Sequence, residues 1–249
     1  MGEETTRNAH EKSLPHTQET GDLEMAMEAF SKSTVLNPSR EESWLNLAYI
    51  QRVEAPSSAV AACMGALKAN PKSHRAYTLL GDAMSLAGRH DAALQAYSAA
   101  IKAEPTGAAS GAHYGLVKAL LADGSLDSAR LAAERGVKAC PDQALAHIGL
   151  GLALLELGRN KDALRSLDEA ISIDGSIGDA HNAMGVVLRR EGKSAAAEES
   201  YGKAAELMPN SAEPYYNMAV LQTVGLNGNF SPVLAPFPFV TLCNLLEED

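Results

Sequence analysis

The chain has 249 residues, which is enough for two ordinary domains, but aromatic residues make up only 5% of it. Few aromatic residues, together with frequent alanine, favour closely packed helices over a sheet. The net charge of −10 argues against a nucleic-acid groove, because such a groove needs a basic surface that replaces counterions.

The chain begins with a polar segment. Residues 1–20 contain Pro15 and show no apolar period, so we interpret them as a disordered lead-in. A helix is expected next, over about residues 22–36, where Ala26 and Phe30 recur at helical spacing. Pro38 then closes this segment, because proline cannot continue a helix.

From about residue 41 to residue 224 one pattern recurs, and its clearest period is 34 residues. Adding 34 to the residue numbers of one repeat gives residues of the same size and polarity, as in His147 and His181 or Gly151 and Gly185. Each repeat holds two stretches with helical periodicity, called here the A helix and the B helix. We therefore expect about six repeats, the first and last incomplete, and about twelve helices.

Two positions characterise each repeat. The first, called here the ring position, lies in the A helix and holds Trp44, Tyr77, His113, His147, His181 and Tyr215. The second lies in the B helix and is alanine in six copies: Ala26, Ala59, Ala93, Ala129, Ala163 and Ala197. We expect a neighbouring helix to approach the alanine so closely that no larger side chain fits.

The spacing changes at two places. The turn at Glu54-Ala55-Pro56 is one residue short, and the fourth repeat is two residues longer than the others. We expect the extra residues in the loop from Thr106 to Ser110, because insertions into surface loops cost little.

This period and pattern resemble the tetratricopeptide repeat (TPR) family. The resemblance covers about residues 21–224. It implies an all-α fold, a right-handed α-solenoid of tandem helix-turn-helix units. It also implies a non-catalytic scaffold whose A helices line a concave groove that binds an extended or helical segment of another protein. The pentatricopeptide RNA readers are helical repeats of similar length, but the acidic charge and the alanine and glycine pattern disfavour them.

The last segment, residues 225–249, departs from the repeat. It carries Pro232, Pro236 and Pro238 among phenylalanines, which excludes a membrane-spanning helix. It is either a cap that covers part of the groove or the end of a shortened version of a longer protein. We favour the shortened version, because Tyr215–Gln222 forms a good A helix that lacks its B helix.

The groove is expected to be partly apolar, because the A helix from Ala144 to Leu155 is apolar on nearly all sides. Such a surface is either a binding site or is closed by the curvature of the solenoid itself. The predicted groove residues are Tyr114, Lys118, Leu121, Leu145, Ile148, Leu152, Leu155, Asn182, Val186, Arg189, Tyr216 and Val220.

No metal, cofactor or catalytic site is expected. His113, His147 and His181 hold the ring position in stacked repeats, about 10 Å apart, which is too far to share a zinc ion. The chain shows no nucleophile, zinc-protease or phosphate-binding motif. Cys63, Cys140 and Cys243 lack a disulfide or metal spacing, so we expect free thiols in the cytoplasm, with the nucleus as the alternative.

The expected partner is a protein or peptide in the groove, with no direct nucleic-acid or membrane contact, and the protein is expected to be a monomer or part of a larger complex. The alternative is the recruiting arm of a larger enzyme or assembly, of the RNA-decay or O-linked glycosyltransferase type. The asparagines that the glycosyltransferase arm would need occur at only two of six positions, Asn46 and Asn217. A co-chaperone for Hsp70 or Hsp90 is less favoured, because no three successive A helices carry the Lys, Asn and Arg set that grips a carboxylate.

Overall fold

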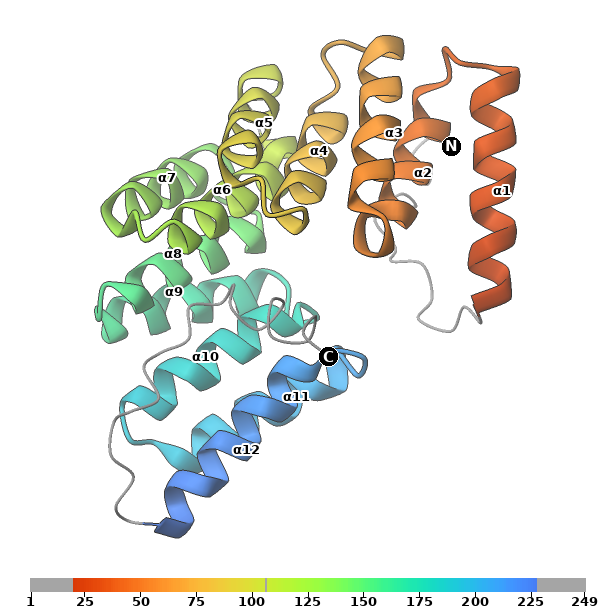
Figure 1. The fold of residues 1–249 in the computed structure, drawn as a ribbon. Coiled ribbons are helices and arrows are strands. Elements are labelled where there is room, and N and C mark those ends of the chain that lie inside the picture. Colours follow the sequence, from red (N-terminus) through yellow and green to blue (C-terminus); the bar gives the residue numbers. More distant parts are fainter. Residues whose placement is uncertain (1–19, 106, 228–249) are drawn as a thin grey trace, which may run out of the picture.

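The computed structural model describes residues 20–105 and 107–227. Within these ranges the chain forms twelve α-helices, one short 3-10 helix and no strand (Figure 1). The helices are α1 (Thr20–Leu36), α2 (Glu41–Glu54), α3 (Pro56–Ala69), α4 (His74–Leu86), α5 (His90–Ala103), η1 (Gly107–Ala109), α6 (Ser110–Ala122), α7 (Leu126–Ala139), α8 (Ala144–Glu156), α9 (Asn160–Ile173), α10 (Gly178–Arg190), α11 (Ser194–Leu207) and α12 (Ala212–Asn227). The predicted all-α solenoid of helix pairs is confirmed.

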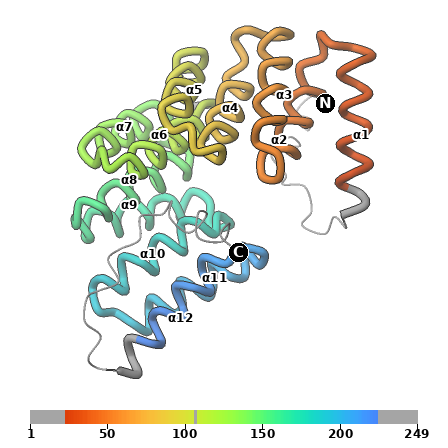
Figure 2. The backbone as a smooth tube through the Cα atoms, viewed as in Figure 1, coloured from red at the N-terminus to blue at the C-terminus, as the bar shows by residue number. Residues whose placement is uncertain are grey.

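The helices form five A–B pairs: α2 with α3, α4 with α5, α6 with α7, α8 with α9, and α10 with α11. Helix α1 is a B helix that precedes the first pair, and α12 is an A helix that follows the last. Figure 2 shows the chain running through successive helical hairpins, which stack along an arc from α1 to α12. Residues 1–19 and 228–249, and with them Cys243 and nearly all of the predicted lead-in and tail, lie outside the described residues.

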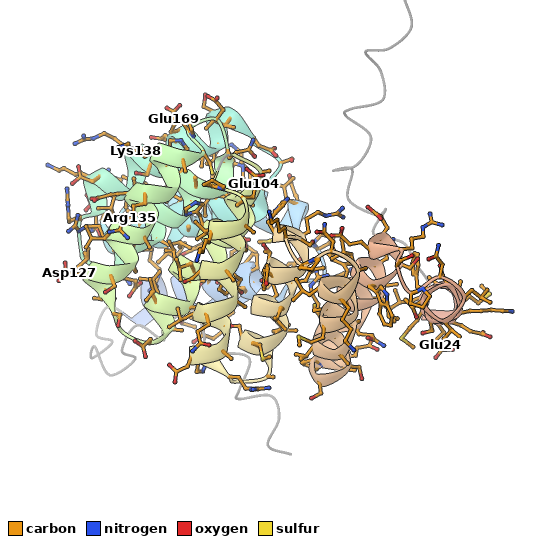
Figure 3. The ribbon with its side chains drawn as sticks, turned by 90° about the horizontal axis from the view of Figure 1, so that it is seen from above. Glu24, Glu104, Asp127, Arg135, Lys138 and Glu169 are labelled. Atoms are coloured by element: carbon orange, nitrogen blue, oxygen red, sulfur yellow. The ribbon has the colours of Figure 1, made fainter. Side chains whose placement is uncertain are left out.

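The A helices form the inner side of the arc. Each of α2, α4, α6, α8 and α10 contacts the next A helix, whereas no comparable contacts join successive B helices in the described part of the chain. Side chains of the B helices such as Asp127, Arg135 and Glu169 are exposed and project from the outer edge (Figure 3). A ligand held along the A helices would therefore lie inside the arc.

Glycine makes the sharp turn between the A and B helices in four of the five pairs. Gly88, Gly124, Gly158 and Gly192 have φ between 69° and 76°, the left-handed region in which a Cβ atom is disfavoured. In each turn the next residue donates its N–H to a carbonyl near the end of the A helix, as from Lys193 to Leu188 at 2.9 Å. The exception is the short turn at Ala55, where Pro56 begins α3 directly.

The alanine position lies at tightly packed helix crossings. Five of these alanines, in α3, α5, α7, α9 and α11, are 0% exposed, whereas Ala26 of α1 is only half-buried. Helix α1 has no A helix of its own among the described residues, which explains why its alanine is less covered.

The longer fourth repeat begins with an extra turn. The 3-10 helix η1 precedes α6 in the loop where the insertion was predicted. No helix within residues 20–105 and 107–227 is both long enough and apolar enough to cross a bilayer.

Candidate functional site

Seven of the predicted groove residues belong to one apolar cluster on the inner side of α6, α8 and α10. They are Tyr114, Leu121, Leu145, Ile148, Leu152, Leu155 and Val186. The cluster continues into the B helices through Leu167 of α9 and Tyr201 of α11, and it reaches Leu221 of α12. The inner side of this half of the molecule is thus continuous with its core.

The apolar inner face of α8 is buried by neighbouring helices. Ile148 is 0% exposed, Leu152 is 3% exposed and Leu155 is 1% exposed. Helix α8 is covered because α6 and α10 flank it and pack against it. These three residues are core side chains in the structure, in keeping with closure by curvature, and a binding role for them stays a prediction.

A hydrogen bond joins α6 to α10, the two A helices that flank α8. Tyr114 of α6 donates its hydroxyl to Asp179 Oδ2 of α10 at 3.4 Å. Burial, followed by the charges of Asp179 and Glu213, raises the pKa of Tyr114 well above its usual value, so the phenol is a stable donor.

A polar cluster follows on α10 and α12. Asn182 is 0% exposed, and its Oδ1 accepts a hydrogen bond from Asn217 Nδ2 at 2.9 Å. Its own Nδ2 has no partner at hydrogen-bond distance, although it faces the Glu213 carboxyl. Burial, then the charge of Asp179, raises the pKa of Glu213, while Lys118 and the Asn182 amide oppose the rise.

Lys118 is central to the inner face. Its Nζ lies 5.4 Å from the centre of the Tyr114 ring, and its charge acts on both Glu213 of α12 and Asp82 of α4. Asp82 accepts a hydrogen bond from the Tyr97 hydroxyl at 2.8 Å. Burial raises the pKa of Asp82, opposed by that hydrogen bond and by the charges of Arg52 and Lys118.

Three further predicted residues differ in their surroundings. Arg189 of α10 lies close to the Tyr201 hydroxyl, and its charge lowers the pKa of Tyr201 against the larger effect of burial. Tyr216 of α12 is 40% exposed, the most accessible side chain of the predicted set, and Val220 on the same helix is half-buried. Tyr216 is thus the one exposed side chain of the predicted set, and the half-buried members include both aliphatic and polar residues.

A profile of the tetratricopeptide repeat matches residues 53–108, 87–144, 114–179 and 148–212, which together span more than half of the chain. The chain belongs to the tetratricopeptide repeat family. Members of this TPR family are generally non-catalytic scaffolds that bind proteins or peptides. No curated protein shows a significant match to the sequence.

Solved TPR structures share this fold. TTC0263, a thermophilic TPR protein in Thermus thermophilus, has a TM-score of 0.64 and 22% identity over 74% of this chain and 99% of that one. A chain of the APC/C hetero-tetramer Cut9–Hcn1 has a TM-score of 0.68 and 16% identity over 84% of this chain and 41% of that one. YrrB, a TPR protein with an unusual peptide-binding site, has a TM-score of 0.47 and 21% identity over 76% of this chain and 97% of that one. At these identities the first two similarities show the fold alone.

The ring position of this TPR array has a role that the repeat pattern did not indicate. Trp44 Nε1 donates to the Pro38 carbonyl at 2.9 Å, and Nε2 of His147 and of His181 lies 2.8 Å and 3.0 Å from the carbonyls of Pro141 and Gly175. Each of these carbonyls belongs to the residue six positions earlier. In these three repeats the ring nitrogen therefore joins the A helix to the end of the preceding repeat, whereas Nε2 of the buried His113 has no hydrogen-bond partner. The six-residue separation is the signal that sequence reasoning could have used.

The three histidines and their surroundings do not form a metal cluster. In the described ranges no group of three or more His, Cys, Asp or Glu side chains is arranged to hold an ion. His113 is 6% exposed, and burial lowers its pKa, which favours the neutral ring.

Sequence reasoning left three carboxylates out of the predicted site. Asp82, Asp179 and Glu213 lie on the inner faces of α4, α10 and α12 beside residues that were included. Helical periodicity does assign all three to the groove face of their A helices, since Asp179 and Glu213 lie two residues before the ring position and Asp82 lies five after it, but the predicted groove set omitted them.

Proposed function

We propose that this TPR protein is a non-catalytic adaptor that holds an extended or helical segment of another protein along the inner side of α6, α10 and α12. The observation that carries the proposal is the composition of this surface. It combines the exposed ring of Tyr216 with the partly buried groups of Tyr114, Lys118, Asp179 and Glu213. Aromatic side chains provide contact area, and the polar groups provide orientation, as in other protein-binding surfaces.

The buried leucine and isoleucine side chains of α8 act as a rigid support in this proposal. Because the support is packed, the polar side chains above it are held in place before the partner arrives, which lowers the entropy cost of binding. The free and buried thiol of Cys63 supports a reducing compartment such as the cytoplasm. Burial raises the pKa of Cys63 to about 12, so that thiol stays protonated and unreactive.

A position-specific crosslinking experiment tests the adaptor function. A photoreactive phenylalanine analogue is placed at Tyr216 in one full-length variant and at Glu169, on the outer side of α9, in another (Figure 3). Both variants are irradiated in cells, and the crosslinked proteins and their peptides are identified by mass spectrometry. We expect the same segment of one partner at Tyr216 in repeated experiments, and its absence at Glu169. Equal products at both positions, or none at Tyr216, would contradict the proposal.

The second candidate is the recruiting arm of a larger assembly. It is favoured by the exposed face of α12 within the described residues, at the place where a B helix packs on the earlier A helices. Tyr215 at the ring position is 49% exposed, while the corresponding His113 and His181 are 6% and 8% exposed. Ala219 is exposed, whereas Ala48 and Gly185, which hold the same position in earlier repeats, are buried. Crosslinking from Ala219 to a constant second subunit, with no product at Tyr216, would favour this candidate over the adaptor.

A further inference from the structure

Two acidic side chains occupy equivalent positions, two residues before the ring position, on the neighbouring helices α10 and α12. Asp179 and Glu213 are both partly buried, and the charge of Asp179 contributes to the raised pKa of Glu213. Neither of them forms an ion pair, although five such pairs occur elsewhere in the described part of the chain. Two neighbouring carboxylates without a paired cation favour the binding of a positively charged ligand.

The cations on the nearby helices are already engaged. Lys118 of α6 faces Asp82 as well as Glu213, and it lies over the Tyr114 ring. On α10, Arg190 is paired with Glu156 at 3.1 Å, and Arg189 lies close to the Tyr201 hydroxyl of α11. Lys118 is therefore shared between two carboxyl groups, and in the described chain neither Asp179 nor Glu213 has a cation of its own in an ion pair.

A buried amide at the same place also lacks a partner. Asn182 is 0% exposed, and its Oδ1 already accepts from Asn217, but its Nδ2 has no acceptor at hydrogen-bond distance. The group that it faces is the carboxyl of Glu213. A buried donor without an acceptor costs about 1–3 kcal/mol, and a fully ionised Glu213 carboxylate that turned toward it would remove that cost.

An exposed aromatic ring stands beside these groups. Tyr216 follows Glu213 by three residues on α12, so both side chains lie on the same face of the helix, and Tyr216 is 40% exposed. Carboxylates next to an aromatic ring suit a lysine or arginine side chain, because its cation can pair with the carboxylates and lie over the ring.

We propose that Asp179, Glu213 and Tyr216, supported by Asn182 and by the Tyr114 hydroxyl, bind one lysine or arginine side chain of the protein partner. This inference rests on the proposed adaptor function and adds the chemistry of the segment that is bound. The cation stabilises the ionised form of Glu213, and that carboxylate then accepts the unused hydrogen bond of Asn182. The net charge of −10 attracts such a segment from a distance.

The test uses the full-length chain and two peptides that differ in one charge. The first is acetyl-Ala-Leu-Arg-Leu-Ala-amide, and the second carries citrulline, a neutral analogue of similar shape, in place of arginine. Binding is followed by NMR through the side-chain amide signal of Asn182 and the ring signals of Tyr216. We expect both sets of signals to shift with the arginine peptide, and the affinity to fall about tenfold with the citrulline peptide.

Variants establish which residues are responsible. Asp179→Asn and Glu213→Gln remove one charge each. Each should lower the affinity for the arginine peptide about five- to tenfold and leave the affinity for the citrulline peptide unchanged. Glu206→Gln, at an exposed position of α11, removes the same charge elsewhere and should change neither affinity. Circular dichroism of each variant confirms that the helices are retained, which we expect because each change removes a repulsive charge.

Equal affinity for the two peptides, no shift at Asn182 and Tyr216, or equal losses from Glu206→Gln and Glu213→Gln would overturn the inference. These outcomes differ from failure of the adaptor function. A partner crosslinked at Tyr216 whose bound segment lacks lysine and arginine would leave the adaptor function standing and reject the cationic site. No crosslink at Tyr216 would reject the adaptor function itself.

Discussion

The Tyr114 hydroxyl lies 3.4 Å from Asp179 Oδ2, although the two residues are 65 positions apart. Their helices, α6 and α10, are separated along the array by α8, so the contact joins two repeats that are not neighbours. The two helices pack on either side of α8, and the Tyr114 ring packs against the apolar cluster to which the side chains of α8 belong. The curvature of the array therefore brings together residues of two repeats that are not adjacent in the chain.

This bond predicts a difference between two substitutions of Tyr114. Tyr114→Phe removes the hydroxyl only and should cost no more than about 1.5 kcal/mol of unfolding free energy. Tyr114→Ala also removes the ring that packs on the cluster containing Ile148, and should cost about 3–5 kcal/mol. Urea unfolding followed by circular dichroism measures both. Equal losses for the two variants would mean that the ring does not cover α8.

The alanine position predicts a second contrast. Ala163 of α9 is 0% exposed, so Ala163→Leu should overpack the helix crossing and cost about 1–3 kcal/mol. Lys161→Ala, two residues earlier on the exposed side, should change stability by less than about 0.5 kcal/mol. The two urea midpoints provide the comparison. Equal midpoints would show that the crossing tolerates a larger side chain and that the position has been misplaced.

The helices could be predicted because their signals are local. The apolar period, the turn glycines such as Gly88 and the prolines after the B helices all act within one repeat, and the twelve predicted helices are present in the described residues. The burial of Ile148 could not be predicted from such local signals. It depends on the small rotation between successive repeats, which sums over three A helices and has no signature in any one of them.

The candidate site was predicted in part for the same reason. Helical periodicity assigns Tyr114, Lys118 and Asn182 to one face of their A helices, and their role in binding stays a prediction. Periodicity does not reveal which residues of different repeats meet. The proximity of Asp179 to Tyr114, and of Glu213 to Asn182, follows from tertiary packing alone.

Two glycines of the sixth repeat should respond to alanine for different reasons. A Cβ atom on Gly185 would lie 2.5 Å from Cε1 of Tyr201, a ring that is itself 0% exposed and has no room to move. Gly185→Ala should therefore cost about 1–3 kcal/mol, more than the helix propensity gained from alanine. Gly192 has open space around it but a φ of 74°, so Gly192→Ala should cost about 1 kcal/mol from backbone strain alone.

A second substitution separates the two causes. Tyr201→Ala opens space beside Gly185, so Gly185→Ala should cost less in that background than in the natural chain. The cost of Gly192→Ala should be the same in both backgrounds, since nothing lies within 4 Å of the added Cβ. A cost of Gly185→Ala that does not depend on Tyr201 would show that the ring does not limit the approach of α10 and α11.

The last prediction concerns the pH dependence of α12. Burial raises the pKa of Glu213 above 4.5, its usual value, so the folded state binds this proton more tightly than the unfolded state does. The stabilisation from the protonated carboxyl is fully present below pH 4.5 and is lost as the pH rises through the raised pKa. Glu213→Gln keeps a neutral side chain of the same size at every pH. Its advantage over the natural chain in urea midpoint should therefore grow from pH 4.5 toward neutral pH.

Hydrogen exchange locates the effect, because α12 is the last helix of the described residues and packs mainly on α11 and α10. Amide protection in α12 should decrease with rising pH in the natural chain, once the intrinsic exchange rates are corrected, and should stay constant in Glu213→Gln. Asp179→Asn should give an intermediate result, because it removes the neighbouring charge but leaves the burial of Glu213 in place. Protection that is independent of pH in the natural chain would show that Glu213 ionises without cost, and that α12 is not held against α10 in the way described.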